Sequence, residues 1–211
     1  MNIMLIDSHD LIRCGVKFIL RDVRNIQIVS EFETCEQAIT DCKENKCEIA
    51  IISFHKFDVS KLDGLNKLMR RLKNLKVLVI TDCLNEVILS YLVKSGVQGC
   101  LSMNTHQDEI IKALKAIKNG ERFVSADIAN YLATSKVNAE TGSPFKRLSS
   151  RELQVVLMIV RGLSPKAIAE SLFLSSKTIS TYRNNIFNKL EVKNEVEMTL
   201  LAIVNGLVEV K

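Results

Sequence analysis

The first 120 residues alternate between short apolar runs and stretches with helical spacing, and this alternation restricts the fold more than any other feature of the chain. The apolar runs have the continuous hydrophobicity of strands buried on both faces, and they occupy residues 2–6, 26–30, 49–53, 76–80 and 97–101. Each run is followed by a stretch with apolar residues at helical spacing, such as Asp10–Arg21. Because parallel strands need crossover helices, five successive β-α units predict a doubly wound, five-stranded parallel sheet of the flavodoxin-like type. We expect this α/β domain to span residues 1–120.

The composition changes after this domain. Ala126 to Ala133 predicts one short helix, and the polar stretch Thr134–Lys146 contains Gly142, Ser143 and Pro144. We therefore assign residues 121–146 to a short helix and an interdomain linker. Residues 147–211 contain only helical patterns, which predicts a second, all-α domain.

Two of the helices expected in this domain are arranged as a helix-turn-helix. Ser164-Pro165 begins the first, Phe173-Leu174-Ser175 forms a turn, and Ser176 is the expected cap of a second helix that ends near Leu190. The second helix has no acidic residue. From Pro144 onward the sequence contains 10 Lys or Arg residues and 6 Asp or Glu residues. The difference, +4, accounts for most of the chain's net charge of +5. Such a surface suits the phosphates and base edges of double-stranded DNA. The alternative interpretation is a helical interaction domain in which this basic helix is only solvated.

Three motifs make this interpretation more specific. They read LSSRE, GLSPKAIA and LSSKTISTYRNNIFNKL, and together they cover most of Leu148–Val192. The segment resembles the LuxR/NarL/FixJ-type DNA-binding domain. The resemblance implies that Ser180, Thr181 and Asn184 face the bases, and that the residues nearer phosphate are Lys166, Ser176, Lys177, Thr178, Arg183 and Lys189. It also implies a homodimer formed through the last helix, Glu195 to Asn205.

An α/β domain followed by this DNA-binding domain is the layout of two-component response regulators. Within that family the chain is similar to the GacA/UvrY-like subgroup, notably in IDSHDLIRCGVKFIL and SSKTISTYRNNIFNKLEVKNEVEMTLLAIVNGLVE. Receiver domains of the family bind Mg²⁺ through carboxylates and accept a phosphoryl group on an aspartate. The resemblance maps this pocket onto Asp7, Ser8, Ser53, Thr81 and Met103, where two serines replace carboxylates and a methionine replaces a lysine. We therefore expect a degenerate receiver domain and a transcriptional regulator that acts independently of phosphorylation.

Enzymatic activity, metal binding and sensing are supported by fewer features of the sequence than DNA binding is. Ser53 and His55 lack the G-x-S-x-G surroundings of a hydrolase nucleophile, so we expect no enzymatic activity. The three histidines are scattered along the chain with few carboxylates near them, so we expect no metal site and no cofactor. Two alternatives stay open: a heterodimer with a related response regulator that modulates it, and ligand or redox sensing through the altered pocket, Cys83 or Cys100.

The cellular location follows from what the sequence lacks. No apolar run is long enough to span a bilayer, and no signal peptide pattern is found. The six cysteines include no CxxC pair. We therefore expect a cytoplasmic protein whose thiols are reduced. We expect it to bind DNA and not a membrane.

Overall fold

The computed structural model describes residues 1–41, 47–55, 59–137 and 143–208. It divides into two compact units, one formed by residues 1–84 and 92–133 and the other by residues 85–91 and 134–211. Within the described ranges, every helix is too short or too polar to cross a membrane.

A single parallel sheet organises the first unit. Its strand order is β2-β1-β3-β4-β5-β6, and every neighbouring pair is parallel. The strands are β1 (Asn2–Ile6), β2 (Gln27–Phe32), β3 (Ile49–Phe54), β4 (Lys76–Thr81), β5 (Gly99–Ser102) and β6 (Phe123–Val124). The predicted doubly wound parallel sheet is confirmed, but it has six strands and not five. The additional strand, β6, is only two residues long, which is too short to leave a recognisable period in the sequence.

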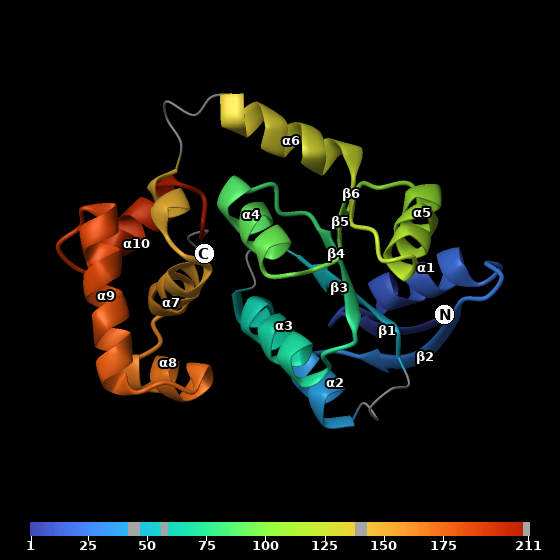
Figure 1. The fold of residues 1–211 in the computed structure, drawn as a ribbon, viewed down its shortest axis with the longest axis horizontal. Coiled ribbons are helices and arrows are strands. Elements are labelled where there is room, and N and C mark those ends of the chain that lie inside the picture. The colour runs from blue at the N-terminus through green and yellow to red at the C-terminus, as the bar shows by residue number, and fades with distance from the viewer. Residues whose placement is uncertain (42–46, 56–58, 138–142, 209–211) are drawn as a thin grey trace. The chain divides into compact units, whose positions relative to one another are not determined.

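Helices lie on both faces of this sheet, as Figure 1 shows for α1 and α5 on one face and for α2 and α3 on the other. The helices between the strands and beyond are α1 (Asp10–Leu20), α2 (Cys35–Asp41), α3 (Val59–Arg71), α4 (Glu86–Lys94), α5 (Gln107–Lys118) and α6 (Ala126–Val137). The helical pattern after β2 runs from Cys35 to Glu44 in the sequence, and the last three of these residues lie outside the described ranges. The predicted end of the next helix, at Ala133, is wrong, because α6 continues through polar residues up to Val137.

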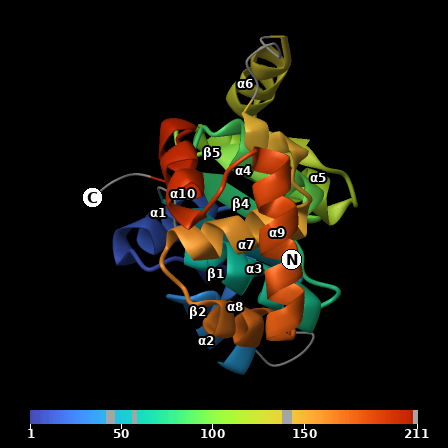
Figure 2. The same cartoon turned by 90° about the vertical axis from the view of Figure 1, so that its left-hand side faces the viewer.

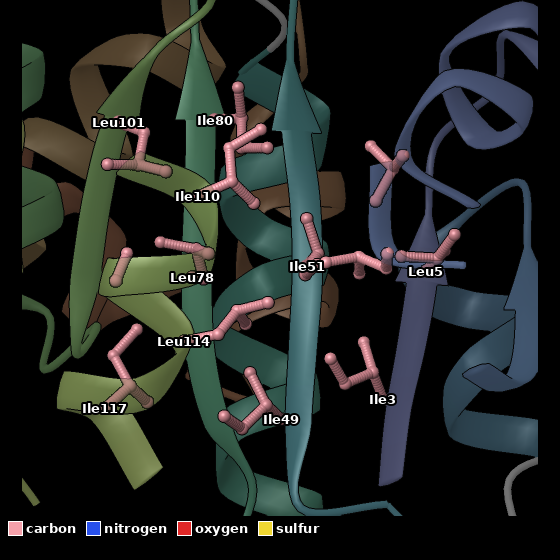
Figure 3. Close-up of a cluster of buried hydrophobic side chains, with 13 residues drawn as sticks. Ile3, Leu5, Ile49, Ile51, Leu78, Ile80, Leu101, Ile110, Leu114 and Ile117 are labelled. Carbon is pink, nitrogen blue, oxygen red and sulfur yellow. The ribbon is translucent and has the colours of Figure 1, made fainter. Parts of the chain in front are cut away.

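Alternating residues of the central strands form the core on the face of α1 and α5. Ile3 and Leu5 of β1, Ile49 and Ile51 of β3, and Leu78 and Ile80 of β4 pack against Ile110, Leu114 and Ile117 of α5 (Figure 3). Because side chains alternate across a strand, the residues between them point to the opposite face and are equally buried there. This two-sided burial fixes the strand register, and so determines which residues meet where the strands end.

The second unit contains η2 (Pro144–Arg147), α7 (Ser150–Val160), α8 (Pro165–Leu172), α9 (Ser176–Leu190) and α10 (Glu195–Val204), in agreement with the predicted all-α domain. Figure 2 shows α9 along one side of the bundle, with α7 and α8 beside it. Phe173 ends α8 in the left-handed conformation, at φ 54°, and this turns the chain toward α9. The cap of α9 is Ser175 and not Ser176, because the Ser175 side chain accepts the Thr178 backbone N–H.

Candidate DNA-binding surface and receiver pocket

The helix-turn-helix exposes the polar face of α9. Ile179, Ile186 and Leu190 are buried on the other face, which determines how the helix is rotated about its axis. Most of the residues expected at DNA are therefore exposed, namely Lys166, Ser176, Lys177, Ser180, Thr181, Asn184 and Lys189, whereas Thr178 and Arg183 are half-buried. The hydroxyls of Ser180 and Thr181 donate to backbone carbonyls one turn earlier, at Ser176 and Lys177.

Two cations of α9 are held by carboxylates of the same unit. Arg183 lies 2.7 Å from Glu195 at the start of α10, and its guanidinium stands 5.8 Å from the ring centre of Phe187. The Nε atom of Arg183 is buried without a hydrogen-bond partner. Lys189 lies 2.7 Å from Glu152 of α7. Both cations, which were expected near phosphate, are therefore engaged by carboxylates in this structure.

Glu152 is a buried acid with several partners. Its carboxylate accepts from the backbone N–H of Ser149, while the Ser149 hydroxyl accepts from the Glu152 backbone, and these two bonds form a capping box at the start of α7. Burial alone would raise the pKa of Glu152, but hydrogen bonds from Lys189 and Ser149 outweigh it and hold the pKa below its usual value. The carboxylate is therefore charged at neutral pH.

The candidate receiver pocket lies where β1 and β3 end. Ile6 pairs with Ile52, so the next residues along the two strands, Asp7 and Ser53, meet at the carboxyl edge of the sheet. Both are almost fully buried, at 2% exposure each. Ser53 thus occupies the end of the central strand, where the resemblance to receivers implies an acidic phosphoacceptor.

Two histidines contact the remaining carboxylate of this pocket. The Nδ1 atom of His9 lies 2.9 Å from one oxygen of Asp7, and the Nε2 atom of His55 lies 2.9 Å from the other. The backbone N–H of His9 also donates to Asp7. Although burial would raise the pKa of Asp7, these bonds and one from the Ser53 side chain hold the pKa below its usual value. In the sequence the histidines are scattered and no cluster was predicted, since His9 and His55 meet only through the strand register.

The other residues of the predicted pocket line the neighbouring strands. Thr81 ends β4, is buried, and accepts the backbone N–H of Cys83 through its hydroxyl. Met103 follows β5, donates its backbone N–H to the Thr81 carbonyl, and packs against the hydrophobic core. Lys61 of α3, which is not among the predicted pocket residues, donates to the Ser53 carbonyl at 3.1 Å. The pocket therefore retains one positive group, which comes from a different element.

Mg²⁺, the ion that receivers hold at this position, does not fit the groups present. Mg²⁺ requires an octahedral shell of oxygens and is usually held by more than one carboxylate. Here Asp7 is the one carboxylate of the cluster, and both of its oxygens face imidazole nitrogens. Ser8 and Ser53 contribute uncharged hydroxyls in place of carboxylates. No step of a phosphoryl-transfer reaction is therefore assigned to this site.

The redox and ligand alternatives each concern a separate feature of the sheet unit. Burial, together with the nearby Cys83 and Asp127, raises the pKa of Cys100 to about 12, so its thiolate is scarce at neutral pH and the thiol is a poor redox sensor. A cavity of about 130 Å³ opens beside Ser8. It is lined by Ile6, Ser8, Glu33, Thr34, Cys35, Glu36, Ile52 and Lys61.

Comparison with known proteins identifies the family. Residues 146–202 match the model described as bacterial regulatory proteins, luxR family. The response regulator UvrY of Escherichia coli K12 is 34% identical over 207 residues, which cover 98% of this chain and 95% of UvrY. The chain belongs to the UvrY/GacA family of response regulators. GacA of Pseudomonas protegens is 32% identical over 207 residues, which cover 98% of this chain and 97% of GacA.

Solved structures of response regulators share this fold. RcsB from Salmonella enterica serovar Typhimurium, bound to promoter P1flhDC with the phosphomimetic BeF3⁻, matches with a TM-score of 0.68 and 25% identity over 98% of both chains. A complex of RcsB with DNA matches with a TM-score of 0.61 and 24% identity, covering 95% of this chain and 96% of that one. The predicted response-regulator architecture, with its LuxR-type helix-turn-helix, is therefore confirmed for this member of the UvrY/GacA family.

Proposed function

We propose that this chain is a sequence-specific DNA-binding transcriptional regulator, with residues 147–211 as its DNA-binding domain. The observation that carries the proposal is the polar face of α9, which is exposed, basic and free of acidic residues, and which follows a helix-turn-helix. Lys177 and Asn184 lie on this face and supply a phosphate contact and a base contact, respectively. The luxR-family match and the DNA complexes of RcsB support the same conclusion.

The receiver-like domain, residues 1–120, acts without a phosphoryl switch. Ser53 is the basis for this second part of the proposal, because a serine hydroxyl cannot replace an aspartate as acceptor from a histidine kinase. The buried side chain of Ser53 contacts Asp7, and Met103 supplies no charge to hold phosphoryl oxygens. The regulator therefore responds to its concentration or to a different signal.

The regulator binds DNA as a homodimer that contacts paired half-sites. Val196, Leu200 and Val204 of α10 are spaced four residues apart and are 70%, 58% and 83% exposed, so they form an apolar stripe along one side of the helix. Burying this stripe against a second copy removes it from water. RcsB, which shares the fold, binds DNA as dimers in one of its solved structures.

Selection from a pool of random duplex DNA tests the DNA-binding part of the proposal. The purified full-length chain is expected to enrich one sequence motif with two half-sites related by symmetry. A Leu200→Asp variant, which places a charge in the apolar stripe, is expected to enrich single half-sites only or to bind weakly. Uniform recovery of all sequences by the wild-type chain would contradict a sequence-specific regulator.

Phosphodonor treatment tests the second part. The chain is incubated with acetyl phosphate, or with beryllofluoride and Mg²⁺, beside a response regulator with an intact pocket. The intact protein is expected to change its dimerisation, whereas this chain is expected to keep both its oligomeric state and its DNA affinity. A clear rise in either quantity would show that the pocket still accepts a phosphoryl group or its analogue.

A further inference from the structure

We propose that Asp7, His9 and His55 form a binding site for one divalent transition-metal ion, with Zn²⁺ as the natural occupant. The candidate ligand atoms are one carboxylate oxygen and one nitrogen from each imidazole, and all three lie within 4.8 Å of one another. Two histidines and one carboxylate are a donor set that binds Zn²⁺ and related ions, leaving positions open for water. The inference does not depend on the DNA-binding proposal.

The distances leave room for an ion after small movements. Each imidazole nitrogen lies 2.9 Å from its oxygen of Asp7. The two nitrogens face different oxygens of Asp7, and the three candidate ligand atoms lie within 4.8 Å of one another. Ligand atoms around a tetrahedral zinc, at bond lengths of about 2.0–2.1 Å, are about 3.3 Å apart, so an ion has to draw these atoms together by no more than about 1.5 Å. The rings of His9 and His55 already stand edge to face, with their centres 4.6 Å apart.

Burial provides a second, independent argument. The Asp7 side chain is only 3% exposed, and a buried carboxylate is stable when a positive partner compensates its charge. Among the described residues no lysine or arginine forms an ion pair with this carboxylate, and the nearby Arg13 donates to the Asp7 backbone carbonyl instead. A metal cation between the imidazoles and the carboxylate compensates the carboxylate charge directly.

The three ligands also differ in exposure in a way that allows an ion to enter. The His9 side chain is 58% exposed and the His55 side chain 22% exposed, whereas Asp7 is enclosed. An ion therefore reaches the carboxylate from the His9 side. Once bound, it connects the segment after β1 to the segment after β3, which are the two ends that a phosphoryl group and Mg²⁺ connect in receivers with an intact pocket.

A metal titration of the full-length chain tests this site. Protein freed of metal with a chelator is titrated with Co²⁺, followed by its visible absorption, and with Zn²⁺, followed by calorimetry. Wild-type protein is expected to bind one equivalent, and His55→Ala and His9→Ala are expected to weaken binding at least tenfold. His106→Ala is the matched control, because His106 is exposed at the start of α5 and its side chain makes no capping bond there. This variant is expected to bind like the wild type.

A second variant keeps the test decisive if the alanine variants fold poorly. His55→Gln introduces a side-chain amide that can still donate a hydrogen bond to Asp7. Because an amide is a weak metal ligand, this variant keeps the hydrogen bond and loses the metal site. Zn²⁺ is expected to raise the thermal unfolding midpoint of the wild type and not of His55→Gln. The proposal is overturned if the wild type lacks a one-equivalent binding step, if the variants bind as tightly as the wild type, or if an equal concentration of Mg²⁺ displaces Co²⁺.

Discussion

The ammonium group of Lys189 lies 2.7 Å from the carboxylate of Glu152, and the same carboxylate closes the capping box of α7. One buried acid therefore joins the end of α9 to the start of α7. Because α9 carries the candidate DNA-binding surface, the orientation of this surface depends in part on the contact between Glu152 and Lys189.

Replacing Glu152 with alanine is expected to lower the free energy of unfolding of the helical unit by about 1–3 kcal/mol, because the change removes the cap and leaves Lys189 without its partner. Urea denaturation of the full-length chain, with hydrogen exchange of α7 to identify the affected unit, measures the loss. Arg147→Ala is the control, since it breaks an ion pair with Glu191 whose two side chains are 65% and 79% exposed. That change is expected to cost less than about 1 kcal/mol, and equal costs would contradict the special role of Glu152.

The same acid determines part of the pH dependence of stability. Its pKa in the folded protein is lowered from the ordinary value of 4.5, so the stabilisation is complete above pH 4.5 and is lost as the pH falls through the lower, folded-state pKa. We therefore expect the unfolding midpoint of α7 to fall more steeply with acid below pH 4.5 in the wild type than in Glu152→Gln. Parallel pH profiles for the two proteins would show that Glu152 does not contribute.

Much of the fold follows from patterns that the sequence carries locally. Buried strands need continuous apolar runs. A helix also has a local signature when its cap, here Ser164, is followed by a proline at the first helical position. The strand β6 and the end of α6 at Val137 were missed because neither has a local period of its own. The cap of α9 was predicted at Ser176 and lies at Ser175 for a similar reason. Two adjacent serines have the same side chain, and only the backbone conformation determines which of them is the cap.

The candidate receiver pocket was predictable only in part. A resemblance to a family identifies positions that correspond to known sites, and Ser53 was found in this way. His55 corresponds to no such position, and it lies 48 residues from Asp7 in the chain. Its contact with Asp7 depends on β1 and β3 being neighbours in register, which no local pattern reveals.

Two substitutions on α9 are expected to separate backbone contacts from base contacts. Lys177→Ala should weaken binding to all sequences and lower the slope of log affinity against log salt by about 1, because one phosphate contact is lost. Asn184→Ala should instead change the preferred base at one position of the selected motif, at a cost of about 1–3 kcal/mol for the original site. Lys115→Ala, at an exposed position of α5 in the sheet unit, removes the same charge and should leave the salt slope unchanged. If the first two variants bind like the wild type, α9 is not the recognition helix.

The ion pair between Arg183 and Glu195 is expected to restrain DNA binding. Glu195 holds the Arg183 guanidinium through one of its terminal nitrogens at 2.7 Å, so that nitrogen becomes available for a phosphate once the carboxylate is neutralised. Glu195→Gln should therefore tighten DNA binding several-fold and steepen its salt dependence. A double-mutant cycle tests whether the effect acts through the arginine: in an Arg183→Ala background, Glu195→Gln should change affinity much less. An undiminished gain in that background would mean that Glu195 acts only through its general negative charge.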